Sequence, residues 1–474
     1  MEANRSTTVA TVAHAGVVRL SESRKLWLLP LVAATYFMVS GGPYGLEDAV
    51  GQAGYGRCLL LLLAIPLLWG LPTALMVGEL AAAIPEEGGF YVWVRRALGP
   101  FWGFQEAWLS LAASLFAMAV YPKLTVIYLT QFAPSLTAGH RGIYWSLAII
   151  LVCAAWNLRG AYSVGQSSLW MFAVLLVPFA GIVFFGVLHT RLLPHFLSRA
   201  LPNFRPLGPL YFSAPKGGSM AAALLVVMWN LMGWDNASTC AREVHDPQRN
   251  YIRAMLAAVA VVSMSYLLPV AMVAFTGMPA DKFATGAWVA AADALAGGHW
   301  LGWAVVACGA VTGVAMFNAS TLSYARIPAA MARDGLAPGV LAQHMKNGVP
   351  WVSVCACCAA WALCVGFSFD RLVELNVLIY GVSLILEFAA LLVLRVREPA
   401  MPRPFLIPGG LWFAGLLAMG PTALVLFALY SERNENLGPV RTPVFLAAVV
   451  LAGPSAFYAI SALKRLRGPA DRAA

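Results

Sequence analysis

The chain has 474 residues, of which 60% are hydrophobic and only 11% are charged. A soluble domain carries about 25% charged residues, so this composition excludes a soluble globular protein and indicates that lipid surrounds most of the chain. The formal net charge is +10, but the basic residues flank hydrophobic runs. That placement is typical of cytoplasmic loops in membrane proteins. We therefore expect a lipid bilayer as the partner, and not nucleic acid.

The apolar runs divide the chain into twelve predicted membrane spans, since each span needs roughly 20 apolar residues. Polar tails at 1–25 and 464–474 precede and follow them, and a longer external segment occupies 192–216. The basic residues place both tails in the cytoplasm of a multi-pass protein of the cell (plasma or inner) membrane. The predicted fold is all-α, with a transport core over 26–398 and two further spans over 399–463. The predicted spans are 26–50, 58–83, 101–131, 143–158, 164–188, 219–243, 252–275, 300–331, 351–369, 372–395, 410–429 and 442–463.

Two spans, the first and the sixth, contain residues that interrupt a helix. The first holds the run SGGPYG at 40–45, and the sixth holds NLMGWD at 230–235. Paired interruptions five spans apart indicate an inverted repeat whose substrate site lies between the broken helices. The alternative is that Gly and Pro are simply common in membrane helices.

Broken helices leave peptide groups unpaired, and lipid does not satisfy them. The amides of Gly41 and Gly42 lie where the outer half-helix would begin, a position that suits an anionic group. The carbonyls near Asn230 suit an ammonium group, and Asp235 would supply the matching negative charge.

Ionisable residues inside spans are costly and are functional candidates by default. Most of them here are acids, which suit a cationic substrate, a proton carrier or both; Lys123 is the chief basic exception. Nearby aromatic rings would add cation–π contacts to an amine. The acids are Glu47, Asp48, Glu79, Glu106, Asp235, Glu374 and Glu387, and the aromatic residues are Tyr44, Tyr121, Trp229, Trp234 and Tyr380.

Each acid also has a structural interpretation. Glu79 ends its span and is expected to hold the following loop, and Glu374 lies near an outer end where water would solvate it. For Glu106 and Glu387 a buried hydrogen bond and a proton role are both open. Asp235 is the strongest functional candidate because it lies beside a helix break.

The histidines, carboxylates and cysteines indicate which coupling ion is favoured and whether catalysis is expected. All seven histidines fall in or beside loops, so carboxylates, namely Glu106, Asp235 and Glu387, are the candidates for carrying a proton. Sodium coupling is the less favoured alternative and would use oxygens of Asn318, Ser320 and Thr321. The chain offers no catalytic cluster, and its eight cysteines form no metal or disulfide pattern. We therefore expect neither an enzyme nor a cofactor or metal site.

Several motifs together resemble the amino acid–polyamine–organocation superfamily, and most of all its polyamine/proton symporter branch from plants and protozoa. The likeness covers about 26–430. The motifs are SGGPYGLED at 40–48, GELA at 78–81, PEEGGFYV at 85–92, FWGFQEAW at 101–108, YP at 121–122, NLRG at 157–160, WNLMGWD at 229–235 with Glu243, and LEF at 386–388.

The resemblance implies a five-plus-five inverted-repeat core, two extra helices, alternating access and uptake of an amine. It also implies that the two breaks, with Glu106 and Glu387, line or support the site. The predicted function is import of polyamines or related cationic amines by proton symport. An amino acid symporter or exchanger, in which Gly41 and Gly42 bind the α-carboxylate, is the alternative.

Overall fold

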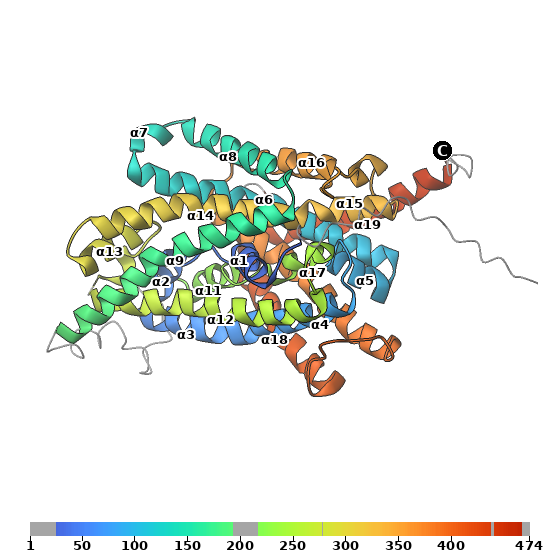
Figure 1. The fold of residues 1–474 in the computed structure, drawn as a ribbon, viewed down its shortest axis with the longest axis horizontal. Helices are drawn as coiled ribbons and strands as arrows, with labels where there is room; N and C mark the ends of the chain where they lie inside the picture. The colour runs from blue at the N-terminus through green and yellow to red at the C-terminus, as the bar shows by residue number, and fades with distance from the viewer. Residues whose placement is uncertain (1–24, 193–216, 277, 438–439, 467–474) are drawn as a thin grey trace, which may run out of the picture.

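The structure is a computed structural model that describes residues 25–192, 217–276, 278–437 and 440–466. The predicted tails (1–24 and 467–474) and the predicted external segment from residue 193 to 216 lie outside the described residues. Figure 1 shows a bundle in which most helices run along its long axis.

The described chain is almost entirely helical, apart from one short hairpin near the C-terminus. Its α-helices are α1 Leu28–Val39, α2 Glu47–Ala53, α3 Tyr55–Ile65, α4 Leu71–Ala83, α5 Phe90–Leu98, α6 Pro100–Phe132, α7 Pro134–Thr137, α8 Arg141–Asn157, α9 Ala161–Leu192, α11 Met220–Trp229, α12 Pro247–Val273, α13 Trp288–Ala296, α14 Trp300–Tyr324, α15 Arg326–Arg333, α16 Trp351–Ala362, α17 Phe369–Arg397, α18 Gly410–Ser431 and α19 Thr442–Leu466. A π-helical turn, η2 Pro66–Gly70, links α3 to α4. The 3₁₀ segments are η3 Trp234–Thr239, η4 Ala241–Glu243, η5 Ala274–Thr276, η6 Ala280–Lys282, η7 Gly339–Ala342 and η8 Glu432–Asn434. Strands β1 Asn436–Leu437 and β2 Val440–Arg441 pair antiparallel.

The twelve predicted spans all correspond to helices. Eight are long and apolar enough to cross a membrane on length and composition. The other four predicted spans contain the shorter helices α1, α8, α11 and α16. The predicted ninth span was too long, because α16 ends at Ala362 and a turn precedes α17. The predicted all-α membrane fold is confirmed.

The two interruptions lie where they were predicted. α1 ends at Val39, Ser40 is extended, and Gly42 and Gly45 have φ values of 74° and 87° before the chain resumes as α2. α11 ends at Trp229, and Gly233 has φ 93° before η3 begins. Glycine tolerates positive φ at little steric cost, and Pro43 lacks the N–H that a continuous helix requires. In Figure 1 both interrupted spans lie inside the bundle.

The loops group at two ends of the bundle. At one, called the inner end, Leu26 forms a β-bridge with Val244 and Glu87 forms one with Cys240. At the other, called the outer end, the loop 280–287 contacts α2, since the Thr285 amide donates to Asp48 Oδ1 at 3.2 Å. The predicted topology would place the inner end in the cytoplasm.

Small residues let α6 and α14 approach closely at the centre. A Cβ at Gly313 would lie 2.2 Å from the Tyr121 carbonyl oxygen, and one at Gly309 would lie 2.5 Å from the Tyr128 ring. Close backbone contact through small residues is a common way for membrane helices to pack. The contact holds the middle of α6 beside the two breaks.

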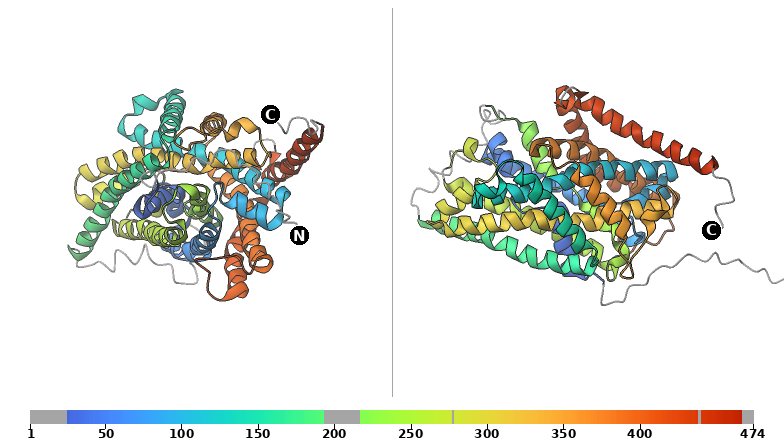
Figure 2. Two further views of the ribbon diagram at one scale, coloured as in Figure 1. Left: turned by 45° about the vertical axis from the view of Figure 1, so that its right-hand side comes forward. Right: turned by 90° about the horizontal axis from the view of Figure 1, so that it is seen from above.

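The last two helices lie outside this central group. α18 packs on α17 and α19 packs on α6. Figure 2 shows α19 as the long red helix at the edge of the bundle. The centre of the molecule is therefore built from the helices that carry the interruptions and from their neighbours α6, α14 and α17.

Candidate functional site

A small pocket with about 10 Å³ of free space lies between the two interruptions and is called the cavity below. None of its lining side chains is more than 6% exposed, so bulk water does not reach it from either end. It is lined by Met38 and Val39 of α1, Ala117 and Tyr121 of α6, Trp229, Asn230, Met232, Gly233 and Asn236 around the second break, Met316 and Tyr324 of α14, and Asn376 of α17.

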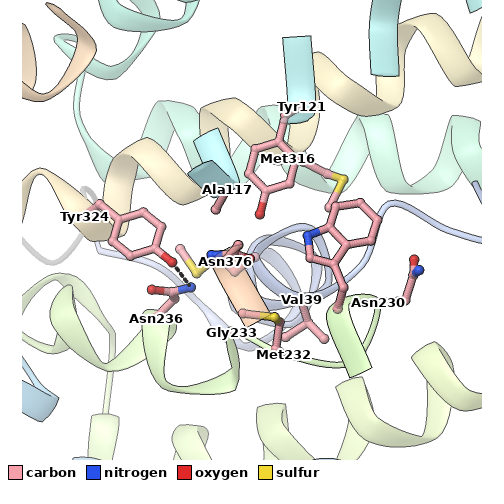
Figure 3. A pocket seen from close by; sticks show the side chains of 12 residues that line it. Val39, Ala117, Tyr121, Asn230, Met232, Gly233, Asn236, Met316, Tyr324 and Asn376 are labelled. Carbon is pink, nitrogen blue, oxygen red and sulfur yellow. Dashed lines mark hydrogen bonds between the residues drawn. The ribbon is translucent and has the colours of Figure 1, made fainter. Parts of the chain in front are cut away.

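Polar side chains around the cavity are held by specific hydrogen bonds. Asn236 Nδ2 lies 3.4 Å from the Tyr324 hydroxyl, and Asn236 Oδ1 accepts from Ser323 at 3.1 Å. Asn376 Nδ2 donates to the Ala113 carbonyl at 3.0 Å. Figure 3 shows Tyr121 and Tyr324 directed toward the same space, which mixes aromatic rings, amides and thioethers. This combination of apolar surface and a few polar groups is common in ligand pockets.

Asp235 lies directly beside the second break. Its side chain is buried and accepts a hydrogen bond from the Tyr380 hydroxyl. The Gly233 amide, released by the break, donates to the same hydroxyl at 3.1 Å. Asp235 is thus joined through Tyr380 to a peptide group exposed by the unwound backbone.

Two further carboxyl groups lie close to Asp235. Glu106 of α6 and Glu387 of α17 are both fully buried, and all three acids are near enough to interact electrostatically. Ser110 donates to Glu106 Oε1 at 2.8 Å. Glu106 Oε2 and both Glu387 oxygens have no hydrogen-bond partner among the residues that the structure describes.

No basic residue compensates this acidic group within the described part of the chain, where no Lys, Arg or His forms an ion pair with Glu106, Asp235 or Glu387. An ionised carboxylate without a partner is very unfavourable in a low-dielectric interior. The acidic group therefore requires protons, a cationic ligand or both.

The other predicted site residues either line the cavity or pack elsewhere in the bundle. Tyr121, Trp229 and Asn230 line the cavity, and Trp234 lies beyond the break, with its indole N–H donating to the Leu231 carbonyl at 2.7 Å. Gly41 packs against α14, since a Cβ there would lie 2.6 Å from the sulfur of Met316.

The remaining first-span residues form contacts away from the cavity. The Gly42 amide donates to Ser40 Oγ at 3.0 Å, and the Tyr44 hydroxyl donates to the Val305 carbonyl at 2.6 Å. Glu47 accepts from the Tyr128 hydroxyl at 2.8 Å and from the Gly286 amide at 3.0 Å. Asp48 accepts from Thr285 Oγ1 at 2.8 Å. Both acids thus hold the outer loop 280–287 instead of facing the cavity.

Sequence reasoning missed several lining residues. Asn376 precedes Tyr380 by one helical turn, and this spacing places both on one face of α17; that signal was available. Asn236 directly follows Asp235 in the interruption. Tyr324 and Met316 gave no comparable signal, since aromatic residues and methionine are ordinary in apolar helices.

The positions considered for sodium form a mostly satisfied polar group. Asn318 Oδ1 accepts from Asn157 Nδ2 at 2.7 Å, and Thr321 Oγ1 donates to the Phe317 carbonyl at 2.7 Å. The Ser320 side chain lies beside Tyr121. Among the described residues, no three His, Cys, Asp or Glu side chains are grouped to hold a metal.

Comparison with known proteins agrees with this architecture. A family model described as amino acid permease matches residues 32–454. The chain belongs to this family of membrane transporters. Among its curated relatives, polyamine transporter RMV1 of Arabidopsis thaliana is 32% identical over 411 residues, which cover 86% of this chain and 80% of the relative. Polyamine transporter PUT1 of Oryza sativa subsp. japonica is 33% identical over 413 residues, 86% of this chain and 74% of the relative.

Proposed function

We propose that this permease imports polyamines or related cationic amines by proton symport. The observation that carries the proposal is the uncompensated acidic group of Glu106, Asp235 and Glu387 beside a cavity formed by two unwound helices. The printed names of the relatives, polyamine transporters, agree with a substrate of this chemistry.

In the proposed binding mode the helices around the cavity move apart to admit the substrate, because the closed cavity is too small for it. One ammonium group of the substrate then pairs with Asp235 and displaces the hydrogen bond from Tyr380. The methylene chain lies along the rings of Tyr121, Trp229 and Tyr324, where a cation also gains from the aromatic faces. Amide oxygens of Asn230 and Asn236 accept from a second amine nitrogen. The mode needs no anionic group on the substrate.

Glu106 and Glu387 supply the proposed proton site. With no cation beside them, at least one must carry a proton when the cavity is empty and closed. A proton on Glu106 or Glu387 removes the like-charge repulsion that disfavours ionised Asp235. The protonated carrier is therefore the form in which Asp235 pairs best with the amine, so the proton and the amine bind together. This linkage is the physical basis of the proposed coupling.

The second candidate is an amino acid symporter or exchanger, which the description of the family model favours. An α-carboxylate would then bind at the first break, near Gly41 and Gly42. In the closed structure the Gly42 amide donates to Ser40 Oγ, so this mode requires that bond to be exchanged for one with the substrate.

Uptake into proteoliposomes separates the two. With an inward proton gradient we expect saturable uptake of labelled spermidine, competition by putrescine, which lacks a carboxylate, and loss of accumulation with a protonophore in sodium-containing buffer. Saturable uptake of neutral amino acids without competition by putrescine would overturn the substrate assignment. Accumulation that survives the protonophore would overturn proton coupling alone.

We also propose that the protein resides in the cell membrane with both termini and the inner end in the cytoplasm. The inner end carries arginines from several segments, among them Arg95 of α5, Arg333 of α15 and Arg403 of the loop 398–409. That excess is the charge pattern of cytoplasmic loops. Protease or thiol-reagent accessibility of tags at the two termini tests the assignment.

A further inference from the structure

We propose that the groove between α17 and α18 binds one anionic phospholipid of the leaflet at the inner end, with its phosphate on Arg397. This site is separate from the transport cavity. The groove has a volume of about 620 Å³ and is almost entirely apolar, with Arg397 as its charged lining residue.

The groove spans about two-thirds of one leaflet. It runs from Trp412, near the start of α18, to Met419, and seven helical residues rise about 10 Å, against about 15 Å for half of a hydrocarbon core. Its walls face outward, since Val396 is 62% exposed, Trp412 83% and Met419 64%. Both helices have the length and composition of membrane spans, so these side chains contact acyl chains.

A glycine forms part of the groove. Gly415 lines it, and a Cβ added there would meet no heavy atom within 4 Å. The space at this position is therefore open to an external chain. An aliphatic side chain placed at 415 would occupy the same volume without displacing a protein atom.

The charge at the inner end of the groove makes its ligand anionic. Arg395 and Arg403 both pair with Glu79, and Arg96 pairs with Glu398. Arg397 is exposed, donates to the Ala97 carbonyl at 3.1 Å and forms no ion pair among the described residues. Arg397 is thus the arginine of this group that has no acidic partner among the described residues, and it lines the groove.

Trp412 places this charge at the depth of the headgroups. Tryptophan favours the boundary between acyl chains and headgroups, and basic pockets between helices on the cytoplasmic side bind anionic lipid headgroups. One phospholipid could place an acyl chain against the apolar walls of the groove and its phosphate against the positive charge of Arg397. A zwitterionic lipid would gain less from this charge.

Native mass spectrometry of the full chain tests the proposal after reconstitution in equal amounts of phosphatidylglycerol and phosphatidylcholine. We expect wild type to retain one phosphatidylglycerol in preference to phosphatidylcholine. Arg397→Gln should lower this preference about five-fold, the effect of one basic residue near the surface, and Arg397→Lys should keep most of it. Gly415→Leu should lower retention of both lipids.

Two matched controls lie at the outer end. Arg433 also donates to a backbone carbonyl, that of Tyr430, and Leu426 is an exposed residue of α18 outside the groove. Arg433→Gln and Leu426→Phe should retain phosphatidylglycerol as wild type does. Equal retention of the two lipids by wild type, or an unchanged preference in Arg397→Gln, would show bulk annular lipid only and overturn the proposal. Unchanged retention in Gly415→Leu would overturn the assignment to the groove.

Discussion

The two ends of the bundle hold their carboxylates with different partners. At the inner end the acids pair with arginines: Glu243 with Arg326, Glu79 with Arg395, and Glu87 with Arg333. At the outer end Glu47 accepts from hydroxyl and backbone N–H groups, and Asp48 accepts from Thr285. Ion pairs also occur at this end, but their basic side chains are exposed: Arg371, paired with Glu374, is 37% exposed, and His299, paired with Asp293, is 86% exposed.

This difference has an energetic consequence. Removing one partner of a buried ion pair leaves a charge without compensation and costs about 3–5 kcal/mol. Removing one neutral donor from a carboxylate that keeps others costs about 1–3 kcal/mol. We therefore expect the inner end to be closed more firmly than the outer end when the cavity is empty, which would favour opening toward the outside for import.

The largest expected effect is at the buried pair of Arg326 and Glu243. Arg326 is 1% exposed, so Arg326→Met should destabilise the closed inner end by about 3 kcal/mol or more. Cys240 is fully buried beneath this pair and reports the change. With the other cysteines replaced, we expect an impermeant maleimide applied at the inner face to label Cys240 much faster in this variant.

Arg96→Met is the matched control, since the Arg96–Glu398 pair lies at the same end but its side chains are 43% and 32% exposed. Exposed pairs contribute about 0–1 kcal/mol, so Cys240 labelling should stay near the rate of the parent. Equal acceleration by both variants would show that burial of the Arg326 pair does not close the inner end.

A smaller effect is expected at the outer end. Tyr128→Phe removes the hydroxyl that donates to Glu47 Oε1 at 2.8 Å, while the Gly45 and Gly286 amides remain as donors. We expect a loss of about 1–2 kcal/mol, seen as a lower thermal unfolding midpoint of the purified protein.

Tyr44→Phe is its control. The two rings lie 4.7 Å apart, but the Tyr44 hydroxyl donates to a neutral carbonyl, that of Val305. The unfolding midpoint should fall less than in Tyr128→Phe. A larger fall in Tyr44→Phe would contradict the importance of the Glu47 carboxylate at this end.

The smallest expected effect is a pH-dependent change in stability, caused by His344 at the inner end. The hydrogen bond from His344 to Glu87 is the main cause that raises the pKa of His344 above 6.5, and the charge of Arg333 opposes it. Burial acts to raise the pKa of Glu87, but His344, Arg333 and Arg326 outweigh it and lower that pKa to about 2. Glu87 therefore stays ionised near neutral pH, and His344 is the group that titrates.

A histidine with a raised pKa stabilises the folded state below its unfolded pKa, and this contribution disappears as pH rises through the folded pKa. His344→Gln should therefore lower the unfolding midpoint at about pH 6 and change it little at about pH 9. Because His344 is only half-buried, the difference should be small. A greater loss at the higher pH would contradict the assignment.

Much of the fold could be predicted because its signals are local. Apolar runs mark the spans, and the Gly and Pro residues of 40–45, with Gly233, mark the interruptions. The helix α13 was missed because it lies between two spans and is too short to give a span signal. The end of α16 was placed too late because the turn after Ala362 is itself apolar.

The site was predicted less completely, because its partners are distant in sequence. Asp235 was chosen for its place beside the break, but its link to Tyr380 crosses 145 positions. Glu79 has a structural role, as expected, yet it holds the loop 398–409 through Arg395 and the Ile407 amide and not the loop that follows it. Glu47 and Asp48 follow the first break as Asp235 follows Gly233, but α2 turns them toward the loop 280–287.

The acidic group beside the cavity is tested most directly by equilibrium binding of labelled spermidine to purified wild type and Asp235→Asn, which keeps the shape of the side chain and removes its charge. We expect saturable binding to wild type and about 100-fold weaker binding to the variant, in the range for losing one partner of a buried charge pair. Equal affinity in the two proteins, with both folded, would show that Asp235 does not hold the amine and would contradict the proposed site.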